Sequence, residues 1–151
     1  LFDYWRSKCR NGTLPTREDI NPVEIHQQLP MISLIEVCSR QEKRRFKYRL
    51  AGTGFWSMFE REITGAYIDE LPMGSTIEYW HRVLGRVVDL ARPSAGVTQP
   101  QTPCKSHLAQ FWIRLPLASD GKTPDMILGF DHLVSLSDVK LLNQPAEKIT
   151  A

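Results

Sequence analysis

The stretch Arg44–Gly54, RRFKYRLAGTG, decides the fold of this chain. Apolar side chains alternate strictly with basic ones along it, a pattern typical of a β-strand with one buried face. The buried face is expected to carry Phe46, Tyr48 and Leu50, and the exposed face Arg45, Lys47 and Arg49. Small residues at 51–54 allow a sharp exit into a second apolar run, 55–59. The stretch therefore predicts a sheet whose aromatic face is covered by helices from the next part of the chain.

The other elements can be placed around this strand. Ser75 and Glu78 have the spacing of a capping box, which predicts the start of the longest helix. That helix is expected at 76–91, with shorter helices at 1–9, after Asn21, at 55–61 and within 63–71. The further strands are expected at 31–38, 94–99, 107–117 and 125–136. This order predicts an α+β fold in which a five-stranded antiparallel sheet carries its helical insert on one face.

The length, net charge, hydrophobicity and cysteine content of the chain exclude several classes of protein. The chain has 151 residues, a size that suits one domain, and its formal net charge is only +2. This charge lacks the strongly basic footprint of a nucleic-acid-binding protein. No apolar run approaches the roughly 18 residues of a membrane span. The three cysteines form no CxxC pair, so we expect free thiols and a cytoplasmic protein.

Several motifs occur in an order that resembles a known family. The chain begins with Tyr4-Trp5, and Leu14–Pro22 reads LPTREDINP. The second strand carries FKYRLAGT, the insert carries ITGAYIDEL at 63–71, and LPLASDGKTPDMIL occupies 115–128. Together they resemble the PAS-like family of single-domain alphaproteobacterial proteins, over nearly the whole chain.

The resemblance implies a PAS fold with an N-terminal helical extension. With the polar composition of the last residues, it leads us to expect one domain over 1–136, including the N-terminal helices, and a polar C-terminal tail over 137–151. It also implies a sensory or ligand-binding module that is not an enzyme and relays its signal through protein contacts. It implies no particular ligand, and the cofactor stays unknown.

The insert and the inner sheet face are expected to enclose an apolar cavity. Its candidate lining is Tyr48, Phe55, Phe59, Trp80, Leu84, Phe111, Ile113 and Phe130. A filled core without a ligand, as in a pure interaction scaffold, remains an equal alternative, because protein interiors are close-packed. An enzyme of isomerase or hydrolase type is a further alternative, and would need an acid or histidine directed into the cavity.

Two cofactor types are disfavoured by the residues. His81 follows Trp80 by one helical position and so points about 100° from the buried stripe, which argues against haem ligation. A cysteine-adduct flavin sensor needs a cysteine in the insert, and 55–91 contains none.

Two surfaces are candidates for protein contacts. Tyr4 and Trp5 give the first helix more apolar surface than a lone surface helix needs, so it packs on the sheet or pairs with a second copy of the chain. The basic face formed by Arg45, Lys47 and Arg49 is expected to be solvated or to contact an acidic partner. RNA-binding sheets place aromatic residues on the exposed face, whereas here they lie on the opposite one, so no nucleic-acid partner is expected.

Overall fold

The computed structural model describes residues 1–40, 43–100, 105 and 107–138. Five antiparallel strands form one sheet in the order β2-β1-β5-β4-β3. The strands are β1 (Ile32–Arg40), β2 (Lys43–Ala51), β3 (Ser94–Thr98), β4 (Leu108–Leu117) and β5 (Met126–Ser135). The expected α+β architecture is therefore confirmed, and each strand lies within two residues of its expected position.

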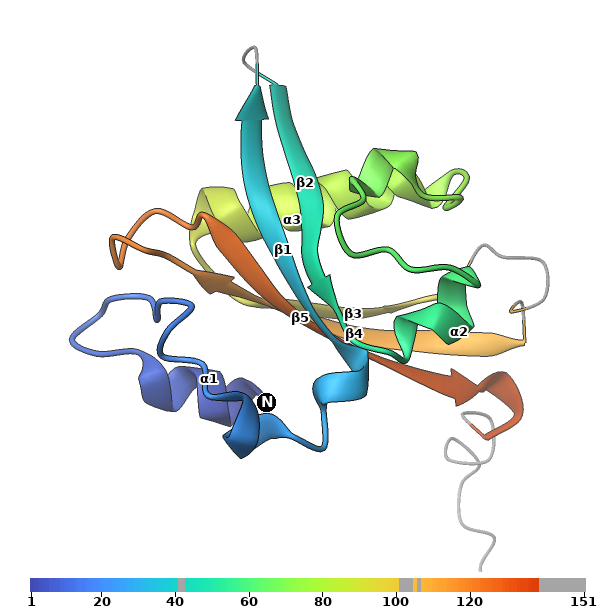
Figure 1. The fold of residues 1–151 in the computed structure, drawn as a ribbon, viewed down its shortest axis with the longest axis horizontal. Coiled ribbons are helices and arrows are strands. Elements are labelled where there is room, and N and C mark those ends of the chain that lie inside the picture. Colours follow the sequence, from blue (N-terminus) through green and yellow to red (C-terminus); the bar gives the residue numbers. More distant parts are fainter. Residues whose placement is uncertain (41–42, 101–104, 106, 139–151) are drawn as a thin grey trace, which may run out of the picture.

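Helices cover both faces of this sheet (Figure 1). The N-terminal segment contains α1 (Phe2–Lys8), η1 (Pro22–Ile25) and η2 (Leu29–Met31). The insert between β2 and β3 contains α2 (Phe55–Phe59), η3 (Ile68–Glu70) and α3 (Thr76–Leu90). We call the sheet face under the insert the inner face, and the face under the N-terminal segment the outer face.

The inner layer is built on the alternation of β2. Phe46 and Tyr48 are buried, as predicted, and pack with Trp80 and Leu84 of α3. Side chains of β1 and β5, among them Ile35 and Ile127, complete this cluster.

The outer layer is a second apolar cluster. Trp5 of α1 is 6% exposed, and its indole Nε1 donates to the Pro116 carbonyl at 2.9 Å. Leu115, Leu117 and Leu128 lie beneath the N-terminal segment and are fully buried. The first helix thus packs on the sheet, one of the two arrangements expected for it.

Leu50 departs from the predicted face. The pairing of β1 with β2 shifts between Leu34 and Ile35, so that Leu34 faces Leu50 while Ile35 faces Tyr48. This bulge takes up one extra residue of β2, Arg49, and a one-residue slip moves a side chain to the other face of a sheet. Leu50 consequently joins the outer face, beside Leu34, and is 41% exposed.

The start of α3 also differs in its detail. The helix begins at Thr76, as expected, but the Ser75 side chain makes no cap hydrogen bond. The Thr76 hydroxyl instead donates to the Met73 carbonyl at 2.6 Å.

The exit of β2 is a structural turn. The amides of Gly52 and Gly54 donate to the carbonyls of Ile32 and Pro30 at 2.8 and 2.7 Å, so the turn is bonded to the start of β1. A Cβ atom on Gly52 would lie 2.1 Å from the Leu29 carbonyl oxygen and 2.4 Å from that of Pro30. Both obstacles are backbone atoms, so only glycine fits there.

We therefore predict that Gly52→Ala lowers the free energy of unfolding by more than about 2 kcal/mol, because overpacking against backbone cannot be relieved by a rotamer change. Gly85→Ala is the matched control: its Cβ would meet only Arg44 Nη1, at 3.9 Å, within α3. The control should stabilise by about 0.5–1 kcal/mol through helix propensity. Urea unfolding measures both, and equal midpoints for the two variants would contradict the argument.

Candidate functional site

A small cavity lies between the insert and the inner face. Its volume is about 30 Å³, room for about two water molecules. It is lined by Met58, Phe59, Pro72, Met73, Thr76, Trp80, Gln99, Pro100 and Gln110. Most of this wall is apolar, and Gln110 is its polar contribution from the sheet.

Gln110 connects the cavity to a buried ion pair. Its Nε2 donates to Asp131 Oδ1 at 2.7 Å, and Arg114 Nη2 donates to the same oxygen at 2.9 Å. The side chains of Arg114 and Asp131 are 1% and 0% exposed. Arg114 Nη1 also donates to the backbone carbonyls of Ile113 and Phe130, at 2.9 and 3.2 Å.

This polar cluster is not fully satisfied. Within the part of the chain that the structure describes, four buried side-chain atoms make no hydrogen bond: Ser33 Oγ, Trp112 Nε1, Arg114 Nε and Asp131 Oδ2. Each orphaned polar atom costs about 1–3 kcal/mol of desolvation, so native structures rarely retain several together without a reason. The cluster therefore holds unused donors and one unused acceptor beneath the insert.

Aromatic rings and a glycine hold the arginine in place. The Arg114 guanidinium lies 4.7 Å from the Trp80 ring centre and 5.7 Å from that of Trp112, within the range of cation–π attraction. A Cβ on Gly129 would lie 2.4 Å from Ser33 Oγ and 3.3 Å from Arg114 Nη1. The absent side chain at Gly129 thus leaves the space that the guanidinium occupies.

The structure divides the eight predicted lining residues into three groups. Phe59 and Trp80 line the cavity. Tyr48, Phe55 and Leu84 are buried in the same inner cluster without lining it, and burial raises the pKa of Tyr48. Phe111, Ile113 and Phe130 lie on the outer face, where they border a separate hollow of about 450 Å³.

The misplacement of these last three residues has a physical cause. Along β4, Phe111 and Ile113 were expected under the insert. Because the N-terminal segment buries Leu115 and Leu117 on the outer face, the C-terminal half of β4 is buried on both faces, and apolar alternation does not identify the insert side. The register of the β4–β5 hairpin was the missed signal: it pairs Trp112 with Asp131 and Arg114 with Gly129, which puts two opposite charges on one face.

The histidines do not gather into a ligand set. His81 is half-buried beside Phe46, with ring centres 5.6 Å apart. Within the described part of the chain, no group of three or more His, Cys, Asp or Glu residues could hold a metal ion.

An ion-pair clasp fixes the insert to the edge of β2. Arg45 binds both carboxylate oxygens of Asp69, at 2.8 and 3.1 Å, and contacts Glu70 Oε1 at 3.1 Å. Its guanidinium also stacks 3.7 Å from the Tyr67 ring centre. Beside it, the Tyr48 amide donates to the Ala66 carbonyl at 2.9 Å. The hydrogen bond from Arg45 lowers the pKa of Asp69, and Arg45 is thereby engaged within the chain.

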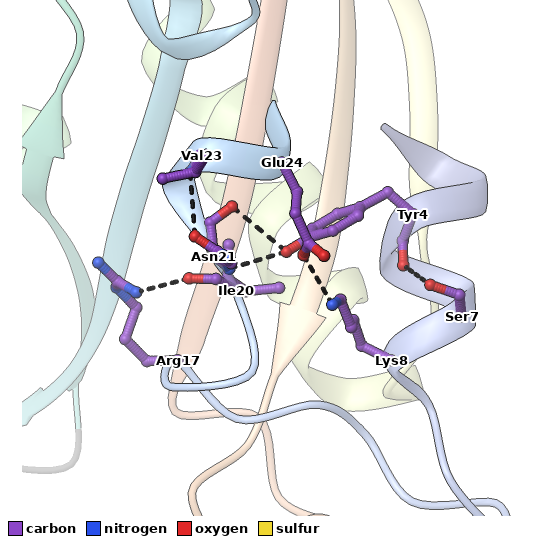
Figure 2. A network of polar contacts seen from close by, with 8 residues as sticks. All are labelled: Tyr4, Ser7, Lys8, Arg17, Ile20, Asn21, Val23 and Glu24. Carbon is purple, nitrogen blue, oxygen red and sulfur yellow. Dashed lines mark hydrogen bonds and ion pairs between the residues drawn. The ribbon is translucent and has the colours of Figure 1, made fainter. Parts of the chain in front are cut away.

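The other candidate contact residues differ in exposure. Lys47 is half-buried, with its Nζ 5.7 Å from the Tyr67 ring centre, whereas Arg49 is exposed. The Tyr4 hydroxyl accepts the Asn21 amide at 2.7 Å, beside the Lys8–Glu24 ion pair (Figure 2). Tyr4 therefore ties α1 to η1.

A family model described as PAS domain matches residues 1–131 of this chain. The chain belongs to the PAS domain family. The resemblance drawn from the motifs is confirmed at this level, and the inner cavity lies between the insert and the sheet of a PAS domain.

Solved structures share the fold at low sequence identity. The Rhodobacter sphaeroides LOV protein has 15% identity and a TM-score of 0.55, over 80% of this chain and 72% of that chain. A sensory box sensor histidine kinase from Vibrio cholerae has 16% identity and a TM-score of 0.51, over 76% of this chain and 89% of that one. The VqmA–ligand–DNA complex of Vibrio cholerae has 14% identity and a TM-score of 0.56; the match covers 85% of this chain but only 60% of VqmA. No curated protein matches the sequence.

The buried ion pair yields a prediction on stability. Arg114→Met alone should lower the free energy of unfolding by about 3–5 kcal/mol, because it leaves Asp131 charged and unpaired in the interior. The double variant Arg114→Met, Asp131→Asn removes both charges and should recover a large part of that loss. Urea unfolding of the two single variants and the double variant measures the coupling, and strictly additive losses would contradict a direct interaction.

The clasp yields a prediction on pH. Asp69 has a lowered pKa in the folded chain, so its stabilising effect is present above the unfolded pKa, about 3.9, and is lost as the pH falls through the lower folded value. At neutral pH, Asp69→Asn should therefore speed amide exchange at Gly65 and Tyr48, whose amides bond across the insert–β2 edge. The difference from the parent chain should vanish in strong acid. Asp3→Asn, at the exposed Arg6–Asp3 pair, is the control and should leave these amides unchanged.

Proposed function

We propose that this PAS domain is a sensory or ligand-binding module whose ligand enters between the insert and the inner face. The ligand would contact Gln110 and, through it, the Arg114–Asp131 pair. Its binding changes the packing of the insert on the sheet, and a protein partner reads the change. This is a shift between two packed states that the ligand binds with different affinities.

The observation that carries the proposal is the unsatisfied polar cluster at the cavity wall. A domain with a purely structural core would gain stability from apolar residues at 110, 114 and 131. Instead, the inner face places an amide on the cavity and keeps unused donors and an acceptor behind it. The present cavity volume, about 30 Å³, describes a closed state, so a larger ligand requires the insert to move outward.

A non-catalytic role suits the carboxylates of the chain better than an enzymatic one. Three acids of the insert serve structure: Glu62 accepts the Thr64 amide at 2.8 Å, and Asp69 and Glu70 bind Arg45. The buried acid Asp131 is bound by Arg114 and Gln110 through the same oxygen. These contacts stabilise the fold or could bind a ligand, and none of them pairs a nucleophile with a base.

The proposal also includes the partner and the compartment. A second copy of the chain meeting through α1 remains our proposed assembly, supported by Phe2, which is 39% exposed on that helix. Trp5 is engaged with Pro116, so the contact would use the face beside it. Of the three residues predicted for the basic face, Arg45, Lys47 and Arg49, the last is exposed and available to an acidic partner. Free thiols at Cys9 and Cys38 suit the cytoplasm. None of the helices in the described part of the chain is long and apolar enough to cross a bilayer.

The test begins with the protein purified from its native host. Native mass spectrometry should show a bound small molecule, and that molecule should raise the melting temperature of ligand-free protein. Gln110→Met should abolish the thermal shift, because it removes the amide from the cavity wall while keeping the length of the side chain.

Arg49→Gln is the matched control, since Arg49 is exposed and outside the cavity. It should retain the full thermal shift. A ligand that stabilises both variants equally would exclude the inner cavity as its site.

A further inference from the structure

A second and larger hollow opens on the outer face, between the N-terminal segment and the sheet. Its volume is about 510 Å³, in the range of small-molecule pockets. Its apolar wall includes Ile20, Ile25, Ile32, Leu34, Leu50 and Leu128. It is separated from the inner cavity by the thickness of the sheet, and the two share no lining residue.

The bulge in β2 builds part of this wall. Without the register shift, Leu50 would point into the inner core with Tyr48; with it, Leu50 borders the hollow and is 41% exposed. Leu29, which lines the same hollow from η2, is 37% exposed. Two large apolar side chains thus meet solvent inside one concave site, which burial by an apolar ligand would stabilise.

The positively charged side chain of Arg17 lies at the border of the hollow. Arg17 is half-buried, and its Nη1 donates to the Ile20 carbonyl at 3.2 Å. Among the described residues it makes no ion pair. Figure 2 shows this bond from the guanidinium to the Ile20 carbonyl, next to Asn21.

Two acids near Arg17 in the sequence are engaged within the chain, and the adjacent Glu18 is exposed and does not line the hollow. Asp19 Oδ2 accepts the Thr16 amide at 2.8 Å, and Glu24 is paired with Lys8 at 2.8 Å. His26 also borders the hollow, with its Nδ1 3.0 Å from the Val23 carbonyl. The described residues that line the hollow thus include the cation Arg17 and no carboxylate.

We propose that this outer hollow binds an amphiphile with an apolar tail and a single carboxylate head, of the size of a medium-chain fatty acid. The tail lies against Leu34, Leu50 and Leu128. The carboxylate pairs with the free edge of Arg17, whose planar guanidinium suits two parallel hydrogen bonds to a carboxylate. The ligand would fix the N-terminal segment to the sheet, because its two walls belong to these two parts of the chain.

The test uses laurate, dodecanol and dodecylamine, which share a tail length and differ in the charge of the head. Isothermal titration calorimetry on the full chain, below the micelle concentration of each compound, should show one laurate site per chain. Laurate should bind at least about tenfold more tightly than dodecylamine, as a charge-assisted hydrogen bond predicts. Equal affinities for the two would overturn the proposal, as would the absence of saturable laurate binding.

Two variants separate the head from the tail. Arg17→Gln should weaken laurate about tenfold and leave dodecanol unchanged, while Arg49→Gln should change neither. Leu50→Glu should weaken all three compounds, because it places a charge on the tail wall. Light scattering of the parent chain and Leu50→Glu detects the competing arrangement: a dimer that this substitution dissociates would show that the hollow is an interface between two copies and would overturn the proposal.

The inner site provides an independent control. Gln110→Met should leave laurate affinity unchanged, since Gln110 is on the opposite face. Loss of laurate binding in Gln110→Met would place the fatty acid in the inner cavity and count against the outer site. Failure of the laurate test leaves the proposed inner ligand untouched, so the two proposals stand or fall separately.

Discussion

Burial of both faces of the sheet is the constraint on which this structure depends. An antiparallel sheet commonly has one face in the core and one in water. Here Ile35 and Ile127 are fully buried under the insert, and Leu115 and Leu128 are fully buried under the N-terminal segment. Under the insert, polar side chains on the inner face of β4 and β5 therefore have no solvent to contact, whereas His132 is exposed where the outer face is open. Arg114 and Asp131 are buried for that reason, and each supplies the partner that makes the burial of the other tolerable.

The same constraint decides what the sequence could predict. Phe46 and Tyr48 were placed correctly because β2 is an edge strand whose basic residues stay near solvent. Its alternation therefore shows which side chains face the core. The helical stripe of Trp80 and Leu84 was equally informative, since α3 covers the sheet with one side only. In β4 both sets of alternate residues are buried toward the end of the strand, and the larger apolar set belongs to the outer face. Hydrophobicity therefore indicated the wrong face of β4. Pairing the residues of β4 and β5 outward from the Asp120-Gly121 turn would have placed Arg114 and Asp131 on the same face.

Other features are invisible to periodicity. The bulge opposite Leu34 arises where β2 must leave the sheet and bond to η2, a demand set by tertiary contacts of Gly52 and Gly54. Because of the bulge, the Leu50 side chain lines the outer hollow and is not part of the inner core. The clasp at Arg45 also depends on residues distant in the sequence. A basic residue on an edge strand is predicted to be solvated, and only the fold shows that Asp69 and Glu70 lie beside it. Residue types were sufficient for the fold, but these details depend on which segments meet.

The two faces are linked by the strands themselves, without a long pathway. Arg114 belongs to the inner polar cluster, yet its Nη1 bonds the backbone of Ile113 and Phe130, whose side chains border the outer face. Ser33 of the inner cluster lies between Ile32 and Leu34, which line the outer hollow. A rearrangement of the Arg114–Asp131 pair would thus act on backbone that the N-terminal segment also packs against. Coupling between sites requires contacts that differ between two states. In this PAS domain the bonds from Arg114 to the Ile113 and Phe130 carbonyls are where such a difference would pass from the insert to the N-terminal helices.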